Sequence, residues 1–115
     1  MTVYNEQGSA FQGTDMDRFD NLRDKILPVL RPYVKRVAIF GSLARGEDTP
    51  ESDIDILVEL RPPEERPPIG LKWFGLEQEL SRILGREVEL VSESALSPYI
   101  RPYIEREKVI LYDEG

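Results

Sequence analysis

The sequence of 115 residues is 40% hydrophobic and 32% charged, which is typical of one ordinary globular domain rather than a disordered chain. It contains no cysteine and no histidine. Disulfides, thiolate or imidazole zinc sites, and catalysis by Ser–His or Cys–His pairs are therefore excluded. A metal ion would have to be held by oxygen atoms, which favours Mg²⁺, with Mn²⁺ as the alternative.

The formal net charge of −7 disfavours a nucleic acid as the direct substrate, because an acidic surface repels phosphates. The same charge would attract a basic protein partner. The sequence has no run of about 20 consecutive apolar residues, so it predicts no membrane-spanning helix. The absence of cysteines suits a reducing environment, so we expect a cytoplasmic protein.

The N-terminal residues 1–14 are polar and without periodicity, which predicts a flexible leader, and residues 15–115 are predicted to form a single domain. Asp15 is positioned to cap a helix that extends to about Arg31. Pro28 lies inside this helical pattern and predicts a kink or an early end.

Two apolar runs in the middle of the chain predict neighbouring strands. The first is Val34–Phe40, which stops at Gly41 and leads into a short helix from about Ser42. The second is residues 53–60, in which apolar and other side chains alternate with the period of a strand. Its two predicted faces are Ile54, Ile56 and Val58 on one side, and Asp53, Asp55, Leu57 and Glu59 on the other.

The C-terminal half continues the alternation of helices and strands. After a proline-rich connection, apolar residues at helical spacing predict a helix over residues 71–84, which Gly85 ends. The remaining predicted elements are a strand at residues 86–91, a short helix at 98–106 and an edge strand at 109–112. Together these elements predict an α/β fold with a small mixed β-sheet and helices packed against it.

The strongest candidate for chemistry is the turn Gly41-Ser42, followed by Asp53 and Asp55 at the start of the next strand. Side chains at positions i and i+2 of a strand share one face, with about 6–7 Å between their Cα atoms. Two carboxylates at this spacing can bind a pair of divalent cations, as in phosphoryl-transfer sites. Gly41 leaves room for a phosphate, and the hydroxyl and N–H of Ser42 can donate to one. The structural alternative is an ordinary strand-to-helix turn beside two solvated aspartates.

Two other motifs resemble this segment only in outline. Gly41 and Gly46 have the spacing of a P-loop, but Glu47 and Asp48 stand where that loop needs Lys and Ser or Thr. Asp53-x-Asp55 begins like a calcium-binding loop, but the apolar residues that follow cannot serve as its ligands. Both alternatives are rejected.

The combination of Gly41-Ser42, Ala44-Arg45-Gly46 and Asp53-x-Asp55 resembles the minimal nucleotidyltransferases of the DNA polymerase β-like superfamily, over residues 19–112. The resemblance implies a palm-like domain in which Asp53 and Asp55 are catalytic metal ligands and Gly41 and Ser42 bind the nucleotide. It also implies a third carboxylate, which matches Glu89. This family usually has Asp at that position, and Glu87 is the nearest competitor.

The role of several charged and aromatic residues is left open by the sequence. Arg45 is expected either to bind the nucleotide phosphate or to pair with acidic loop residues. Trp73 fits the apolar stripe of its helix better than a site for stacking on a base. Lys72, Arg82 and Arg86 are expected to be surface charges.

The resemblance implies a Mg²⁺-dependent transfer of NMP, with AMP from ATP as the expected case, to a hydroxyl group. It further implies that the acceptor is a tyrosine of a cognate HEPN-type toxin and that this chain is the antitoxin. Two Mg²⁺ ions are expected, and a partner or a second copy of the chain is expected to complete the cleft. The alternatives are a catalytically impaired antitoxin that acts by binding alone, and a transferase acting on a small molecule of the aminoglycoside type.

Overall fold

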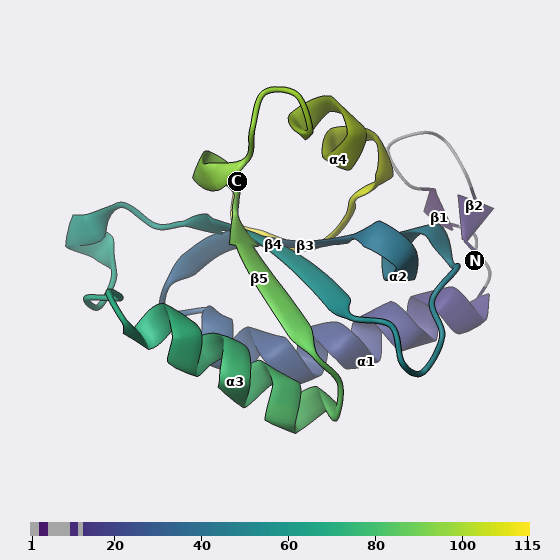
Figure 1. Ribbon diagram of the computed structural model, residues 1–115, viewed down its shortest axis with the longest axis horizontal. Helices are drawn as coiled ribbons and strands as arrows, with labels where there is room; N and C mark the ends of the chain where they lie inside the picture. The colour runs from purple at the N-terminus through teal and green to yellow at the C-terminus, as the bar shows by residue number, and fades with distance from the viewer. Residues whose placement is uncertain (1–2, 5–9, 12) are drawn as a thin grey trace.

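The computed structural model describes residues 3–4, 10–11 and 13–115, and a four-stranded mixed sheet forms its centre (Figure 1). The strands of this sheet are β3 (Val34–Phe40), β4 (Ile54–Leu60), β5 (Val88–Ser92) and β6 (Val109–Asp113). Their order is β5-β4-β3-β6, with β4 and β5 parallel and the other two pairs antiparallel. The predicted small mixed sheet is confirmed, and the last strand lies at its edge as expected.

Two long helices cover one face of the sheet. They are α1 (Gly13–Leu30) and α3 (Lys72–Leu84), which contact each other as well as the strands. Pro28 lies in the last turn of α1, and the helix ends two residues after it. Between the helices and the sheet lies the main core, with these buried aliphatic side chains among its members: Ile26, Leu30, Ile39, Ile56, Val58 and Leu80. Trp73 packs against this core, as the helical pattern predicted.

The opposite face of the sheet carries a much thinner layer. The short helix α4 (Arg101–Glu107) lies over it, above the strands in Figure 1. A small cluster of Ala38, Leu57 and Ile104 is buried beneath this helix. Leu57 therefore faces α4, whereas its neighbours Ile56 and Val58 face the main core, which confirms the predicted alternation along β4.

The remaining elements are short. They are α2 (Gly41–Arg45), two turns of 3-10 helix, η1 (Pro63–Glu65) and η2 (Glu93–Ala95), and the antiparallel pair β1 (Val3–Tyr4) and β2 (Ala10–Phe11). Thus η1 adds one regular turn to the proline-rich connection. α4 begins at Arg101, three residues later than predicted, because the chain first turns at residues 97–100.

Two further predictions concern the N-terminal leader and membrane-spanning helices. Of the predicted flexible leader, residues 1–14, the structure describes only residues 3–4, 10–11 and 13–14, so the division at residue 15 stays a prediction. The helix expected to be capped by Asp15 begins earlier, at Gly13, so Asp15 lies inside α1. In the part of the chain that the structure describes, no helix combines the length and the apolar character needed to cross a membrane.

Candidate active site

The turn after β3 brings Gly41 into contact with Asp55. Phe40 pairs with Asp55 in the antiparallel register of β3 and β4, so the chain leaves β3 directly beside this carboxylate. Gly41 has a φ of +72°, and a Cβ built on it would lie 2.2 Å from Asp55 Oδ2. Only glycine meets both conditions without strain or collision. α2 begins at Gly41, one residue before the predicted Ser42, because the left-handed glycine already starts the turn.

Asp55 and Glu89 lie side by side on neighbouring strands. They are partners in the parallel register of β4 and β5, which places their side chains next to each other on one face of the sheet. Asp53 is exposed and lies just before β4, near enough for its charge to act on Asp55. Glu87 was the other candidate for the third carboxylate. Its backbone carbonyl accepts the N–H of Ile54 at 2.8 Å. The structure therefore brings Glu89, rather than Glu87, to Asp55.

The environment of Asp55 disfavours its negative charge. Burial is the largest cause and, together with the neighbouring carboxylates Glu89, Asp53 and Glu107, raises the pKa of Asp55 to about 6. Among the residues that the structure describes, no lysine or arginine forms an ion pair with Asp53, Asp55 or Glu89. The group thus has the like-charge repulsion that a bound divalent cation would relieve.

The donor set fits Mg²⁺ in its chemistry, because Asp53, Asp55 and Glu89 offer only hard oxygen ligands. Their arrangement is looser than a finished metal centre: in the described part of the chain, no three acidic side chains converge closely enough to hold an ion. The register partners are Asp55 and Glu89, and the Asp53 side chain would have to turn toward them to join in binding a metal.

A fourth carboxylate, Glu107 of α4, lies at the same place and was not anticipated from the sequence. Its Oε1 accepts the backbone N–H of Gly41 at 3.0 Å, and its Oε2 accepts Arg45 Nη1 at 2.8 Å. Arg45 also reaches Glu47 at 3.3 Å. Of the two roles left open for Arg45, pairing with acidic residues is the one that this structure shows. Glu107 follows Gly41 by 66 residues and belongs to no motif, so only the packing of α4 places it here.

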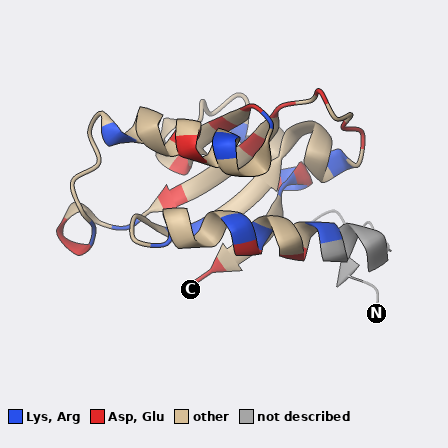
Figure 2. Ribbon diagram, turned by 90° about the horizontal axis from the view of Figure 1, so that it is seen from below, with Lys and Arg blue, Asp and Glu red and all other residues tan. Residues whose placement is uncertain are grey.

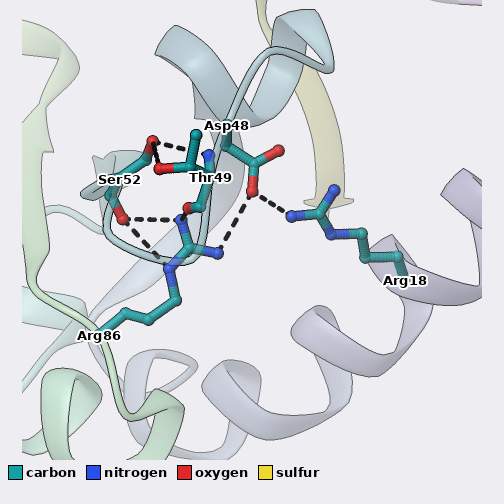
Figure 3. Close-up of polar contacts among 5 residues, drawn as sticks. All are labelled: Arg18, Asp48, Thr49, Ser52 and Arg86. Carbon is teal, nitrogen blue, oxygen red and sulfur yellow. Dashed lines mark hydrogen bonds and ion pairs between the residues drawn. The ribbon is translucent and has the colours of Figure 1, made fainter.

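The loop between α2 and β4 is held by a second group of charges, shown in Figure 3. Arg86 donates to the carbonyl oxygens of Ser52 and Thr49, and both Arg86 and Arg18 pair with Asp48. Burial would raise the pKa of Asp48, but the hydrogen bonds and charges of Arg18 and Arg86 hold it below the usual value. Arg86 is thus not the free surface charge that was expected, whereas the Arg82 side chain is 77% exposed.

Comparison with known proteins decides the family. The nucleotidyltransferase domain family matches residues 23–111, which is most of the chain and includes every candidate site residue. This chain belongs to the nucleotidyltransferase domain family. The predicted resemblance is confirmed at this level, and the chain is a nucleotidyltransferase.

Two relatives show which kinds of nucleotidyltransferase this chain is similar to. The Methanocaldococcus jannaschii protein MJ0128, assigned as a protein adenylyltransferase, is 49% identical over 77 residues, covering 66% of this chain and 74% of its own. A solved structure assigned as a minimal nucleotidyltransferase is 34% identical, with a TM-score of 0.65, and covers 86% of this chain and 98% of its own.

One chain of a solved toxin–antitoxin complex shares the fold of this nucleotidyltransferase. The complex is a tri-AMPylated Shewanella oneidensis HEPN toxin with an MNT antitoxin. One of its chains matches with a TM-score of 0.62 at 22% identity, over 83% of this chain and 72% of the matched chain. At this identity the likeness concerns the fold alone. The predicted α/β nucleotidyltransferase architecture is confirmed, while the roles of individual site residues stay predictions.

Proposed function

We propose that this nucleotidyltransferase transfers AMP from ATP to a tyrosine hydroxyl of a cognate HEPN-type toxin and thereby acts as its antitoxin. The observation that carries the proposal is the contact between Gly41 and Asp55, whose register partner is Glu89, in a chain 49% identical over 77 residues to an assigned protein adenylyltransferase. A phosphate-binding turn and metal-binding carboxylates must be adjacent for nucleotidyl transfer, because both act on one triphosphate.

In the proposed reaction the tyrosine oxygen forms a bond to the α-phosphorus of ATP. The bond from that phosphorus to the bridging oxygen of the β-phosphate breaks, pyrophosphate leaves, and the tyrosine proton passes to solvent. When bound, Mg²⁺ would neutralise the triphosphate and make the attacking hydroxyl more acidic. Asp53, Asp55 and Glu89 would hold the metal, while Gly41 and Ser42, at the start of α2, would bind the phosphates beside them.

Arg45 is the basic side chain of this site, and we include it among the nucleotide-binding residues. It extends from the end of α2, 45% of its side chain is exposed, and its partners Glu107 and Glu47 are carboxylates that a phosphate could replace. A guanidinium binds phosphate oxygens with the same forked geometry that it uses for carboxylates.

A protein acceptor is supported by the surface beside the site. Helix α4, which carries Glu107, and the turn before it expose large side chains to solvent: Tyr99 (86%), Ile100 (48%) and Tyr103 (64%). Exposed aromatic and aliphatic groups of this kind are typical anchors of protein–protein interfaces. An acidic chain with such a surface suits a basic protein better than a small hydrophilic acceptor.

The alternative is an antitoxin that acts by binding alone, and two features favour it. The three carboxylates do not converge closely enough to form a metal centre by themselves. In addition, Glu89 occupies a position at which the minimal nucleotidyltransferases usually have Asp. Both forms of the proposal use the same partner, so an assay of transfer separates them.

The test is incubation of the chain with α-labelled ATP, Mg²⁺ and the product of the neighbouring gene as the candidate partner. We expect label on that partner, its loss with EDTA, and its loss in the Asp53→Ala/Asp55→Ala double variant. The matched control is Glu59→Gln, which alters a carboxylate on the same strand that is paired with Lys35 and Arg36. A stable complex without label from any of the four nucleotides would leave docking alone as the function.

A further inference from the structure

The loop that carries Asp53 has little support from its own residues. Its one tight turn is closed by Ser52 N–H donating to the Thr49 carbonyl at 3.0 Å and Thr49 N–H donating to Ser52 Oγ at 2.9 Å. Asp53 follows this turn immediately and lies outside β4, which begins at Ile54. The position of Asp53 therefore depends on what holds the turn against the rest of the molecule.

Arg86 holds that turn from a distant part of the chain. It stands between the end of α3 and the start of β5, and it reaches the carbonyl oxygen of Ser52 with Nη2 at 2.7 Å and Nε at 3.1 Å. The same Nη2 donates to the Thr49 carbonyl at 2.9 Å. Figure 3 shows the guanidinium lying among these acceptors, with its fork turned toward the loop. A lysine ammonium has no such planar fork and cannot reproduce this pattern.

Asp48 fixes the guanidinium in turn. Arg86 Nη1 lies 3.3 Å from Asp48 Oδ2, and Arg18 of α1 pairs with the same carboxylate from the other side. The Asp48 side chain is 4% exposed and that of Arg86 is 19% exposed, so this group is shielded from water. An ion pair with two cations and a nearly buried carboxylate is held far more firmly than an exposed pair.

The peptide groups on both sides of Asp53 are thus hydrogen-bonded, one to Arg86 and the other to the next residue, Glu87. Before it, the Ser52 carbonyl is held by Arg86, and after it, the Ile54 N–H donates to the carbonyl of Glu87 at 2.8 Å. Two residues further along the same segment lies Glu89, the partner of Asp55. One short segment therefore supplies Glu89 and also determines where Asp53 lies relative to it.

We propose that Arg86 is a positioning residue that sets the distance between Asp53 and the Asp55–Glu89 pair, and so the affinity of the site for its divalent cation. The proposal rests on the proposed function, in which these three carboxylates hold the metal. It concerns this chain's own loop: Arg86 contacts none of the three carboxylates and would act on them through the Thr49–Ser52 turn. Outer residues that orient metal ligands have effects of about 10- to 100-fold on metal affinity or activity.

A purely structural role for Arg86 makes a different prediction. If the guanidinium only fastened an exposed loop, its replacement would lower the thermal midpoint and leave metal affinity unchanged. If it positions Asp53, metal affinity falls even where the protein is fully folded. Metal binding by the folded chain therefore separates the two roles, and a measure of folding alone does not.

The experiment compares Arg86→Lys with the matched control Arg82→Lys, on the neighbouring helix, whose side chain is 77% exposed and 3.9 Å from Glu79. Binding of Mn²⁺ alone is measured from the electron paramagnetic resonance signal of the free ion. We expect Arg86→Lys to weaken Mn²⁺ binding by about tenfold or more, and Arg82→Lys to bind like the unaltered chain. In the transfer assay, Arg86→Lys should need about tenfold more Mg²⁺ for half-maximal rate, with most of the maximal rate recovered at saturation.

The outcomes distinguish this inference from the function on which it rests. Superimposable Mn²⁺ titrations for Arg86→Lys and the unaltered chain, both folded by circular dichroism, would overturn it, as would an absence of Mn²⁺ binding by the unaltered chain. Should Arg86→Lys not fold, Arg86→Gln is measured in its place with the same expectation. Normal Mn²⁺ binding by the unaltered chain without any AMP transfer would instead contradict the proposed function, while the Arg86 comparison would still be decided by the Mn²⁺ titration.

Discussion

The face of the sheet beneath α1 and α3 is filled with aliphatic side chains, whereas the face beneath α4 has a small apolar cluster and several ionisable groups. On the α4 side lie the neighbouring carboxylates Asp55 and Glu89 and a chain of ion pairs through Arg36, Glu93 and Lys108. The outer surface of α1 carries charges of both signs, as an exposed helix face does (Figure 2). Apolar burial stabilises a fold, while burying carboxylates costs free energy. The sheet therefore separates the part that stabilises the molecule from the part proposed to act on ATP.

Asp55→Asn should separate activity from stability most strongly. Loss of this metal ligand is expected to lower AMP transfer by about 1,000-fold or more, since metal coordination supplies several kcal/mol to the transition state. The same change should stabilise the metal-free chain at pH 7 by about 1–2 kcal/mol, after allowance for solvent screening. Labelled transfer and urea unfolding measure the two effects on one preparation. A variant that loses both activity and stability would contradict the separation of the two faces.

The pH dependence of stability follows from the direction of the pKa shift. The pKa of Asp55 is raised from 3.8 to about 6 in the folded chain, so the folded state binds this proton more tightly than the unfolded state. The contribution of Asp55 is fully favourable below about pH 4 and is lost as the pH rises through about 6. Urea unfolding between pH 4 and pH 7, without metal, should show this loss in the unaltered chain. Asp55→Asn should lack that part of the pH dependence.

Leu80→Ala is the converse change, on the other face. Leu80 belongs to α3 and is fully buried in the main core, so its truncation should lower the free energy of unfolding by about 3 kcal/mol. The transfer rate at 25 °C should stay within about twofold of normal as long as the chain remains folded. Ile104→Ala, in the small cluster under α4, should cost less, about 2 kcal/mol, because fewer side chains surround the cavity. Equal costs at the two positions would argue against a thin α4 layer.

Gly41→Ala should affect both properties, because Gly41 lies where the strand turns into the site. A side chain here is strained at a φ of +72° and collides with Asp55, so we expect about a 100-fold loss of transfer from displaced reacting groups. Gly46→Ala is the matched control: its φ is +73°, but a Cβ there meets nothing within 4 Å. Both variants should lose about 1 kcal/mol of stability from backbone strain. Equal transfer rates in the two would mean that contact with Asp55 is unimportant.

The features that could be predicted from the sequence are those with a local signature. The alternation along β4 follows from a strand's period of two, and it placed Asp55 and Leu57 on the face opposite Ile56 correctly. The parallel pairing of β4 with β5 then brought Glu89 to Asp55, at the position that the resemblance to minimal nucleotidyltransferases had indicated. Regular periods, turn residues and motif spacing carry this information within about ten residues.

The residues that could not be predicted are charged groups whose partners lie far away in the sequence. Arg86 meets Asp48 across 38 positions, and Glu107 meets Gly41 across 66. Isolated arginines and glutamates are mostly exposed, so composition alone favours the surface assignment that was wrong for Arg86. Only tertiary packing decides which long side chains find a partner, and no periodicity reports it.

Glu107→Gln gives the smallest expected effect. It tests whether the contacts of Glu107 with the Gly41 turn and Arg45 hinder or help the binding of ATP. The Glu107 carboxylate accepts both the Gly41 N–H and Arg45, two groups that the proposed function assigns to phosphate. Substrate binding must therefore compete with this carboxylate, and removing its charge should free Arg45. Because a partly exposed ion pair contributes up to about 1 kcal/mol, the KM for ATP should fall by about two- to fivefold, with little change in kcat.

The control for this effect is Glu47→Gln, which removes the other carboxylate beside Arg45, at 3.3 Å and 64% exposed. It should lower the KM for ATP less, because it releases no backbone N–H of the turn. An increase in KM for Glu107→Gln would instead mean that Glu107 supports the bound nucleotide, for example by keeping the Gly41 turn in its left-handed conformation. The sign of the change in KM thus decides whether α4 competes with ATP for the Gly41 turn or prepares that turn to receive it.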